Sequence, residues 1–255
     1  MEIFVGTSGW AYLWNPDGLE WYVKNSNLNA IELNASFYRY PYPNQVKGWS
    51  NKGKNLRWVL KVNRLVTHVY RFNRIAWTRW KSFEKLFQPL DSITDFYLFQ
   101  LPPSIKSDSK KKIESFYKKT KLKERFALEW RNQEWFTKEN VKWAKKLGLT
   151  LVSVDSPKLP RDVFNTSGIT YIRMHGREAW YSHYYTDKEL NEVKNKILKV
   201  KPEKVYVFFN NDTSMLENGR RMFELLTKGE ISKESVLLKT TSKAVATVKK
   251  IVSKK

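Results

Sequence analysis

Apolar, β-branched and aromatic residues gather in eight short runs along the chain, and nearly every run ends at a polar or charged residue. The runs cover residues 3–5, 30–33, 58–60, 96–99, 126–128, 149–154, 171–174 and 205–209. Strands of a parallel sheet are covered by helices on both faces, so they are apolar along most of their length. Eight such strands in a chain of 255 residues predict a TIM (β/α)8 barrel that forms a single domain over residues 1–255.

Most of the stretches between the runs show helical periodicity. We expect helices over residues 82–88, 140–147 and 188–198, and a heavily charged helix within 106–125. Residues 156–169 contain Pro157, Pro160 and Gly168 and are too interrupted for a full helix, so the helix between strands 6 and 7 should be short or missing. Residues 239–255 contain six Lys, no acidic residue and apolar positions at helical spacing, which predicts a basic C-terminal helix.

The composition indicates which partners, which chemistry and which cellular compartment to expect. Lys and Arg number 47 against 25 Asp and Glu, a net charge of +22, so nucleic acid or a smaller anion is a candidate partner. Excess Lys is also common in hyperthermophile proteomes, where it says nothing about partners. The absence of Cys excludes disulfides and thiolate chemistry. No apolar stretch approaches the ~18 residues that span a bilayer, and Met1 leads into the first strand without a basic leader, so we expect a cytoplasmic protein that does not bind membranes.

Three carboxylates and a histidine lie at the ends of runs. Glu32 is in the second run, Glu129 follows the fifth, Asp155 follows the sixth and His175 follows the seventh. TIM-barrel active sites lie at the carboxyl ends of the strands, where these side chains would converge. Carboxyl groups in different environments can act as acid and base, so these four residues are the catalytic candidates.

Cationic, hydrogen-bonding and aromatic residues lie near the four catalytic candidates, at or close to the predicted strand ends. Side chains alternate between the two faces of a strand, so Glu32 shares a face with Asn34, and Glu129 with Arg131. Cations at these positions would bind an anionic substrate, or would neutralise the carboxylates in a structural ion-pair lattice. The candidate substrate-binding residues are Thr7, Ser8, Trp10, Asn34, Tyr38, Arg39, Lys61, Gln100, Arg131, Arg173, Asn210 and Asn211.

A divalent metal is an alternative for the same carboxylates, because hard oxygen ligands and an imidazole suit Mg²⁺ or Mn²⁺. The chain has three His in total and no H-x-H or H-E-x-x-H spacing. We therefore assign no metal ligand. The sequence identifies no cofactor and no oligomeric state.

Seven motifs in order span nearly the whole chain. They are Gly6-Thr7-Ser8-Gly9-Trp10, residues 32–38, Thr67-His68, Gln100-Leu101-Pro102-Pro103, Glu129-Trp130-Arg131, Arg173-Met174-His175-Gly176 and Phe209-Asn210-Asn211. Together they resemble the YecE-like family, known as domain of unknown function 72. The resemblance implies a TIM barrel but no established activity. The family is likened to the endonuclease IV and xylose isomerase barrels, whose metals are held by His-rich clusters that this sequence lacks.

Three functional hypotheses follow. The leading one is an enzyme of hydrolase, lyase or isomerase type that acts on an anionic sugar phosphate or a nucleic-acid-derived substrate at the carboxyl-terminal rim. The first alternative is a non-catalytic nucleic-acid-binding protein with a basic, aromatic-rich surface. The second is a glycosidase, which needs two free carboxyl groups roughly 5–10 Å apart across a cleft.

Overall fold

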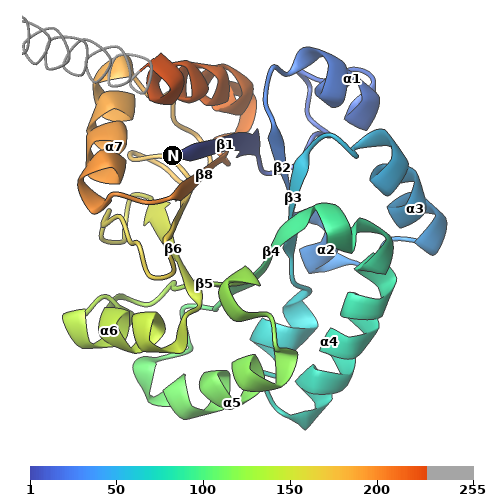
Figure 1. Ribbon diagram of the computed structural model, residues 1–255, viewed down its shortest axis with the longest axis vertical. Helices are drawn as coiled ribbons and strands as arrows, with labels where there is room; N and C mark the ends of the chain where they lie inside the picture. Colours follow the sequence, from blue (N-terminus) through green and yellow to red (C-terminus); the bar gives the residue numbers. More distant parts are fainter. Residues whose placement is uncertain (229–255) are drawn as a thin grey trace, which may run out of the picture.

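Eight parallel strands form a closed barrel, which confirms the predicted TIM-barrel fold (Figure 1). The computed structural model describes residues 1–228, so the helix expected at 239–255 lies outside the described residues. Each strand pairs with the next along the chain, and β8 closes the barrel against β1. The strands are β1 (Glu2–Thr7), β2 (Ala30–Leu33), β3 (Arg57–Lys61), β4 (Thr94–Gln100), β5 (Phe126–Glu129), β6 (Thr150–Asp155), β7 (Ile169–Met174) and β8 (Lys204–Phe209).

Helices form a ring around the strands (Figure 1). They are α1 (Gly18–Asn25), α2 (Ala35–Tyr38), α3 (Pro43–Lys52), α4 (Arg74–Phe87), α5 (Lys110–Thr120), α6 (Lys138–Leu147) and α7 (Asp187–Val200), followed by helical residues 215–228. Residues 156–168 connect β6 to β7 without a helix, which confirms the expected gap in the ring. At the start of α7, Thr186 and Glu189 form a capping box that satisfies free backbone N–H groups.

The register of the strands decides which side chains reach the mouth of the barrel. Apolar side chains fill the interior, among them Ala30 and Val59. Because alternate residues face the same side, Glu32 and Lys61 lie two positions further along those faces, nearer the carboxyl ends of the strands. The buried residues of this interior core are Ala30, Val59, Phe96, Leu98, Ala127, Val152, Tyr171, Tyr206 and Phe208.

A second, larger core lies between the strands and the helices and takes up much of the aromatic content. Trp58, Trp80, Trp130 and Trp135 are among the largest fully buried side chains. Aromatic side chains bury roughly 150–250 Å² each and dominate such cores. Packing of the helices onto the barrel therefore accounts for many of the aromatic residues.

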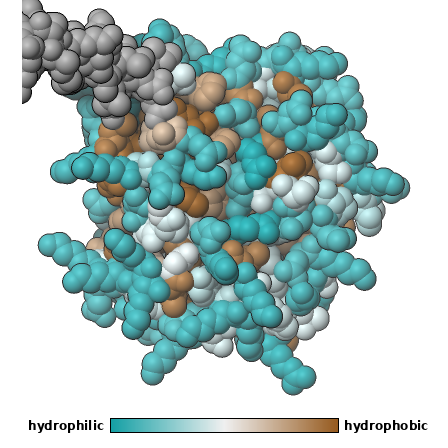
Figure 2. Space-filling model, in the orientation of Figure 1, coloured by the Kyte–Doolittle hydropathy of each residue, from teal (hydrophilic) through white to brown (hydrophobic). Residues whose placement is uncertain are grey.

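The outer surface is hydrophilic. Figure 2 shows one face covered mainly by hydrophilic side chains, many of them protruding. On α5, Lys111, Lys112 and Lys118 are exposed, whereas Ile113 and Phe116 are buried. Among residues 1–228, no helix has the length and apolar character needed to cross a membrane.

Candidate active site

A fully buried arginine lies at the carboxyl end of the barrel. Arg173 of β7 donates to Glu32 of β2 from Nε at 2.9 Å and from Nη2 at 2.6 Å. Its Nη1 donates to Glu129 of β5 at 2.6 Å. None of the three side chains is exposed to solvent. One guanidinium group therefore links three strands that are far apart in the sequence.

The Glu32 carboxylate has further hydrogen-bond donors. It accepts from Ser8 Oγ at 2.7 Å and from the hydroxyl of Tyr171. Burial and the neighbouring Glu32 raise the pKa of Tyr171 well above its ordinary value. Tyr171 is therefore protonated and able to donate, so that Glu32 is hydrogen-bonded on both oxygens.

A second arginine extends this network to a histidine. Arg131 donates to Glu129, and its Nη2 lies 3.0 Å from Nε2 of His175. The same Nη2 lies 3.4 Å from Oε1 of Gln100. Burial, with the charges of Arg131 and Arg173, lowers the pKa of His175 well below its ordinary value. The imidazole is therefore neutral, and Nε2 accepts a hydrogen bond from Arg131.

The two glutamates are paired rather than free. Burial alone would raise the pKa of Glu129, but Arg131, Arg173 and Lys61 together lower it. Glu32 and Glu129 both bind the guanidinium of Arg173 and do not face each other across an open cleft. The paired-carboxylate arrangement that a glycosidase needs is absent at these residues. The contacts of both glutamates therefore match the structural ion-pair arrangement considered in the sequence analysis, and they favour a role in holding Arg173.

A cavity of about 340 Å³ opens at the mouth of the barrel, and we call it the mouth cavity. Its lining residues are Tyr12, Asn34, Tyr38, Lys61, Tyr181, Asn210 and Asp212. Asn34 Oδ1 lies 3.3 Å from Nη2 of Arg173, and Asn210 Nδ2 lies 3.3 Å from Nδ1 of His175. These amides connect the buried arginine network to the cavity.

Lys61 is the amine of the mouth cavity. The residue is 7% exposed, and its Nζ lies 4.3 Å from the centre of the Phe37 ring. Burial and the charge of Arg173 lower the pKa of Lys61 to about 7, although Glu129 and Glu32 oppose the shift. Among residues 1–228, no carboxylate forms an ion pair with Lys61. This side chain therefore exists in comparable amounts as ammonium and free amine at neutral pH.

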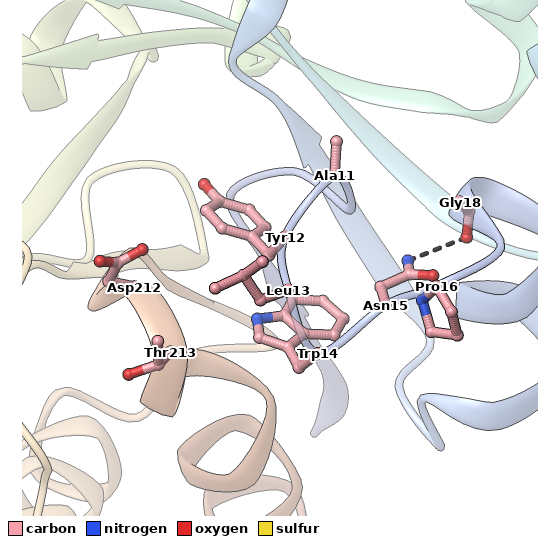
Figure 3. Close-up of a pocket in the computed structure, with 9 residues that line it drawn as sticks. All are labelled: Ala11, Tyr12, Leu13, Trp14, Asn15, Pro16, Gly18, Asp212 and Thr213. Atoms are coloured by element: carbon pink, nitrogen blue, oxygen red, sulfur yellow. Dashed lines mark hydrogen bonds between the residues drawn. The ribbon is translucent and has the colours of Figure 1, made fainter.

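A larger cavity of about 690 Å³ adjoins the mouth cavity, because Tyr12 and Asp212 line both. Figure 3 shows it between the loop after β1 and the segment after β8. Leu13, on the β1 loop, is 97% exposed. Burial and the nearby Asp212 raise the pKa of Tyr12 to about 12, so its hydroxyl is protonated at neutral pH. A ligand longer than the mouth cavity could extend along this loop.

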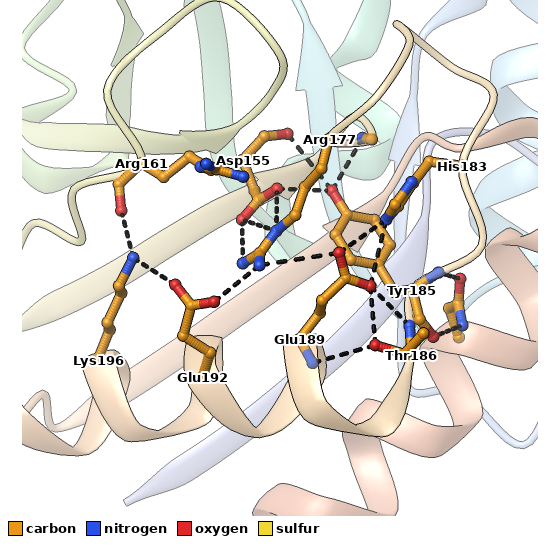
Figure 4. A network of polar contacts seen from close by, with 11 residues as sticks. Asp155, Arg161, Arg177, His183, Tyr185, Thr186, Glu189, Glu192 and Lys196 are labelled. Carbon is orange, nitrogen blue, oxygen red and sulfur yellow. Dashed lines mark hydrogen bonds and ion pairs between the residues drawn. The ribbon is translucent and has the colours of Figure 1, made fainter.

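Asp155 does not join the other catalytic candidates. On β6, Val152 faces the barrel interior, so the alternation turns Asp155 outward, toward α7. Asp155 accepts from Arg177 at 2.9 Å and from the Tyr185 hydroxyl at 2.9 Å. Arg177 also binds Glu192 of α7, and the network continues along that helix (Figure 4). The contacts of Asp155 therefore attach α7 to the barrel and leave it away from the mouth.

Four predicted substrate-binding residues belong neither to the mouth cavity nor to the buried network below it. Thr7 Oγ1 donates to the Gly9 carbonyl within the turn after β1. Trp10 packs edge-on against Trp49 and Trp58, at ring centroid distances of 5.5 and 5.7 Å. Arg39 is exposed and is not part of the cavity lining. Asn211 Nδ2 is used in hydrogen bonds to His183 and Asn218. These contacts are structural.

The structure brings the remaining predicted site residues together in two groups. Asn34, Tyr38, Lys61 and Asn210 line the mouth cavity. The others form the buried network below it: Ser8, Glu32, Gln100, Glu129, Arg131, Arg173 and His175.

Four residues of the site are outside the predicted catalytic and substrate-binding sets: Tyr12, Tyr171, Tyr181 and Asp212. Tyr171 could have been found, because it precedes Arg173 by two positions on the same strand face. Asp212 could not, because it lies beyond β8 with φ of 57° and strand alternation does not extend to it. Tyr12 and Tyr181 lie in loops whose paths the sequence does not determine.

The described part of the chain contains no preformed ligand set for a resident metal ion. Over residues 1–228, no group of three or more His, Cys, Asp or Glu side chains is arranged to hold a metal ion. Glu32 and Glu129, below the mouth cavity, are already bound to Arg173 and Arg131, and Asp212 is the one carboxylate among the residues that line the cavity.

Solved structures with the same architecture include two proteins of one family. A DUF72 family protein from Thermotoga maritima is 24% identical, with a TM-score of 0.74, and the match covers 89% of this chain and 100% of the other. One from Enterococcus faecalis is 23% identical, with a TM-score of 0.74, covering 89% and 98%. D-psicose 3-epimerase from Clostridium cellulolyticum, solved with D-tagatose, is 12% identical with a TM-score of 0.58, covering 89% and 99%. At these identities the similarity shows the fold alone.

Sequence comparison gives the family. No curated protein matches the chain. The family model described as "Protein of unknown function DUF72" matches residues 4–242, which is most of the chain and confirms the resemblance carried by the seven motifs. The chain therefore belongs to the DUF72 family.

Proposed function

We propose that the protein is an enzyme of isomerase or lyase type that acts on a small anionic sugar, such as a sugar phosphate, in the mouth cavity. The observation that carries the proposal is Lys61, an amine without a carboxylate partner among residues 1–228, lining that cavity beside the charges of Arg173 and Arg131. The ammonium form of Lys61 attracts an anion, and low-dielectric walls strengthen the attraction.

The lining of the cavity supports a polyhydroxylated ligand. Asn34 and Asn210 offer amides, and Tyr12, Tyr38 and Tyr181 offer hydroxyl groups and ring faces. Such groups fix the orientation of a polar ligand through hydrogen bonds while the rings cover its apolar faces. The same barrel architecture occurs in a D-psicose 3-epimerase solved with D-fructose, at a TM-score of 0.51 and 10% identity, so the fold is compatible with sugar chemistry.

Ligand-induced stabilisation tests this proposal. The full-length protein is heated with a panel of aldose and ketose phosphates, the corresponding unphosphorylated sugars and inorganic phosphate. A ligand at about 100 times its Kd stabilises the folded state by ~2.7 kcal/mol, which raises the melting temperature measurably. We expect a sugar phosphate to raise it more than its unphosphorylated counterpart or phosphate alone, and Asn34→Ala to reduce the effect.

The matched control is Asp155→Asn, which alters the carboxylate outside the mouth. We expect this variant to keep the ligand-induced shift, measured from its own melting temperature. If no sugar phosphate exceeds inorganic phosphate, or if Asp155→Asn removes the shift while Asn34→Ala keeps it, the proposed site is wrong.

A further inference from the structure

The geometry around Lys61 provides the starting point. Its side chain extends from the carboxyl end of β3, is buried along its stem, and reaches the mouth cavity. The Phe37 ring packs beneath Nζ at 4.3 Å. The cations on the buried side are Arg173 and Arg131, while Glu129 and Glu32, the carboxylates whose charges act on Lys61, are already bound by those arginines.

The other groups near Lys61 within residues 1–228 form no ion pair with it. His68 packs edge-on against Phe37 with ring centroids 4.9 Å apart, and its Nδ1 lies 2.8 Å from Thr67 Oγ1. Burial and the charge of Lys61 lower the pKa of His68 to about 4, so this ring is neutral at pH 7. The mouth cavity is also lined by the carboxylate of Asp212 and by the phenol groups of Tyr12, which follows β1, and Tyr38, which ends α2.

The free-amine content of Lys61 differs from that of a surface lysine. With the pKa lowered from 10.5 to about 7, a substantial fraction of the Lys61 side chains carry a lone pair at pH 7. An ordinary lysine carries one in roughly one of three thousand molecules at the same pH. A desolvated amine next to other cations is an established way to make a lysine nucleophilic.

We propose that Lys61 Nζ is a covalent nucleophile that forms a Schiff base with the aldehyde or ketone carbonyl of an open-chain substrate. The lone pair of Nζ attacks the carbonyl carbon and the carbonyl oxygen takes up a proton, giving a carbinolamine. Loss of one water then gives the imine, which is protonated to the iminium ion. No oxidant or reductant is consumed. This inference rests on the proposed function for its choice of a sugar phosphate as substrate.

The charges around Nζ also favour the next step. An iminium ion near Arg173 and Arg131 is destabilised, so it withdraws electrons strongly from the adjoining carbon. Loss of a proton from that carbon, or cleavage of the bond beyond it, converts the cation to a neutral enamine. The first route serves an isomerase and the second a lyase. Asp212 is the carboxylate that lines the same cavity and is available as proton acceptor.

Reductive trapping tests the inference directly. The full-length protein is incubated at pH 7 with glyceraldehyde 3-phosphate and sodium borohydride, and the adduct is located by peptide mass spectrometry. Borohydride delivers hydride to the imine and leaves a stable secondary amine. We expect one adduct per chain on Lys61, and at least roughly tenfold less on each surface lysine, given the difference in free-amine content. Equal labelling of Lys61 and the surface lysines would overturn the inference.

Two variants separate loss of the nucleophile from loss of the fold. Lys61→Met removes the amine and should give no adduct at position 61 while melting cooperatively. Lys52→Met removes an exposed lysine of α3 that pairs with Glu20, and should label at Lys61 as the parent protein does. Unchanged total labelling in Lys61→Met would contradict the inference.

The pH profile and a second probe distinguish this inference from the proposed function. Labelling by glycolaldehyde, which has no phosphate, should rise with pH around a midpoint near 7 at Lys61, well below the pKa of about 10.4 of a lysine in a model peptide. If glycolaldehyde labels Lys61 in this way but no sugar phosphate stabilises the protein, the inference stands and the substrate class is wrong. If a sugar phosphate stabilises the protein but no carbonyl compound labels Lys61 preferentially, the substrate class stands and the nucleophile is wrong.

Discussion

At the scale of single residues, Arg173 determines the electrostatics of the mouth. Its burial costs solvation energy, which two carboxylates and their hydrogen bonds offset. Such a buried network is weak evidence for stability, since apolar side chains of the same volume often serve as well. Its consequence at Lys61 is more specific, because burial first, and then the fixed charge of Arg173, lower the pKa of that amine. We interpret the network as a means of setting the electrostatic environment of the mouth cavity.

We predict that Arg173→Met destabilises the protein by about 3–5 kcal/mol, since two buried carboxylates lose their shared partner. Guanidinium unfolding at pH 7 measures the loss. The control is Arg221→Met, which breaks an exposed pair with Asp187 and should have a much smaller effect. Adding Glu32→Gln and Glu129→Gln to Arg173→Met should recover part of the loss. A loss for Arg173→Met no larger than for Arg221→Met would show that the network is solvated.

Lys61 gives a prediction about pH. Its pKa of about 7 in the folded state lies below the ordinary 10.5, so the unfolded chain binds more protons between these values. The contribution of Lys61 to the unfolding free energy therefore rises with pH across this window, by at most about 5 kcal/mol. We expect Lys61→Met to be more stable than the parent protein at about pH 6, and this advantage to shrink by about pH 10. Denaturant unfolding at both pH values measures it, and a constant difference would contradict the lowered pKa.

At the scale of elements, the apolar runs predicted all eight strands to within about two residues at each end, because strands buried on both faces give a strong signal. The expected helix at 82–88 covers only the second half of α4, and α3 was not predicted because Val46 is its one buried residue. Alternation correctly paired Glu32 with Asn34. It could not orient Asp155, because every residue of β6 is buried and neither face is marked as polar.

The role of Asp155 gives a prediction for α7. Asp155→Asn weakens the bonds to Arg177, so we expect faster amide hydrogen exchange along α7 and unchanged exchange in β2 and β3. The loss of stability should be smaller than that of Arg173→Met, because the Arg177 side chain is partly exposed. Hydrogen exchange read by mass spectrometry measures both regions. If protection falls at the mouth strands rather than at α7, Asp155 belongs to the site after all.

At the scale of the whole molecule, the chain carries a net charge of +22, and among residues 1–228 exposed lysines lie outside the site. The exposed lysines of α5 lie on the outer ring of helices, whereas the arginines of the mouth are engaged in ion pairs. A polyanion attracted by such a surface releases counterions, so its affinity falls steeply with salt. The charge and the mouth cavity are therefore separable by experiment.

We predict weak, salt-sensitive binding of DNA or RNA that is independent of the mouth. Non-specific Kd values of roughly 10⁻⁴ to 10⁻⁶ M are typical of such contacts at physiological salt. Fluorescence anisotropy with a labelled duplex, measured across a salt series, should give the same curve for the parent protein and Asn34→Ala. Tight binding that survives high salt, or that Asn34→Ala abolishes, would favour the nucleic-acid-binding alternative over the proposed enzyme.

The bonds of Arg173 have a consequence for how the barrel is assembled. Glu32 lies in the half that contains β1 to β4, while Glu129 and Arg173 lie in the half that contains β5 to β8. A fragment made of the first half alone would bury Glu32 without its cation, which is strongly unfavourable. We therefore expect the two halves, produced as separate chains, to be poorly folded individually and to complement each other when mixed. Charge neutralisation at the mouth thus couples the two halves into one cooperative unit.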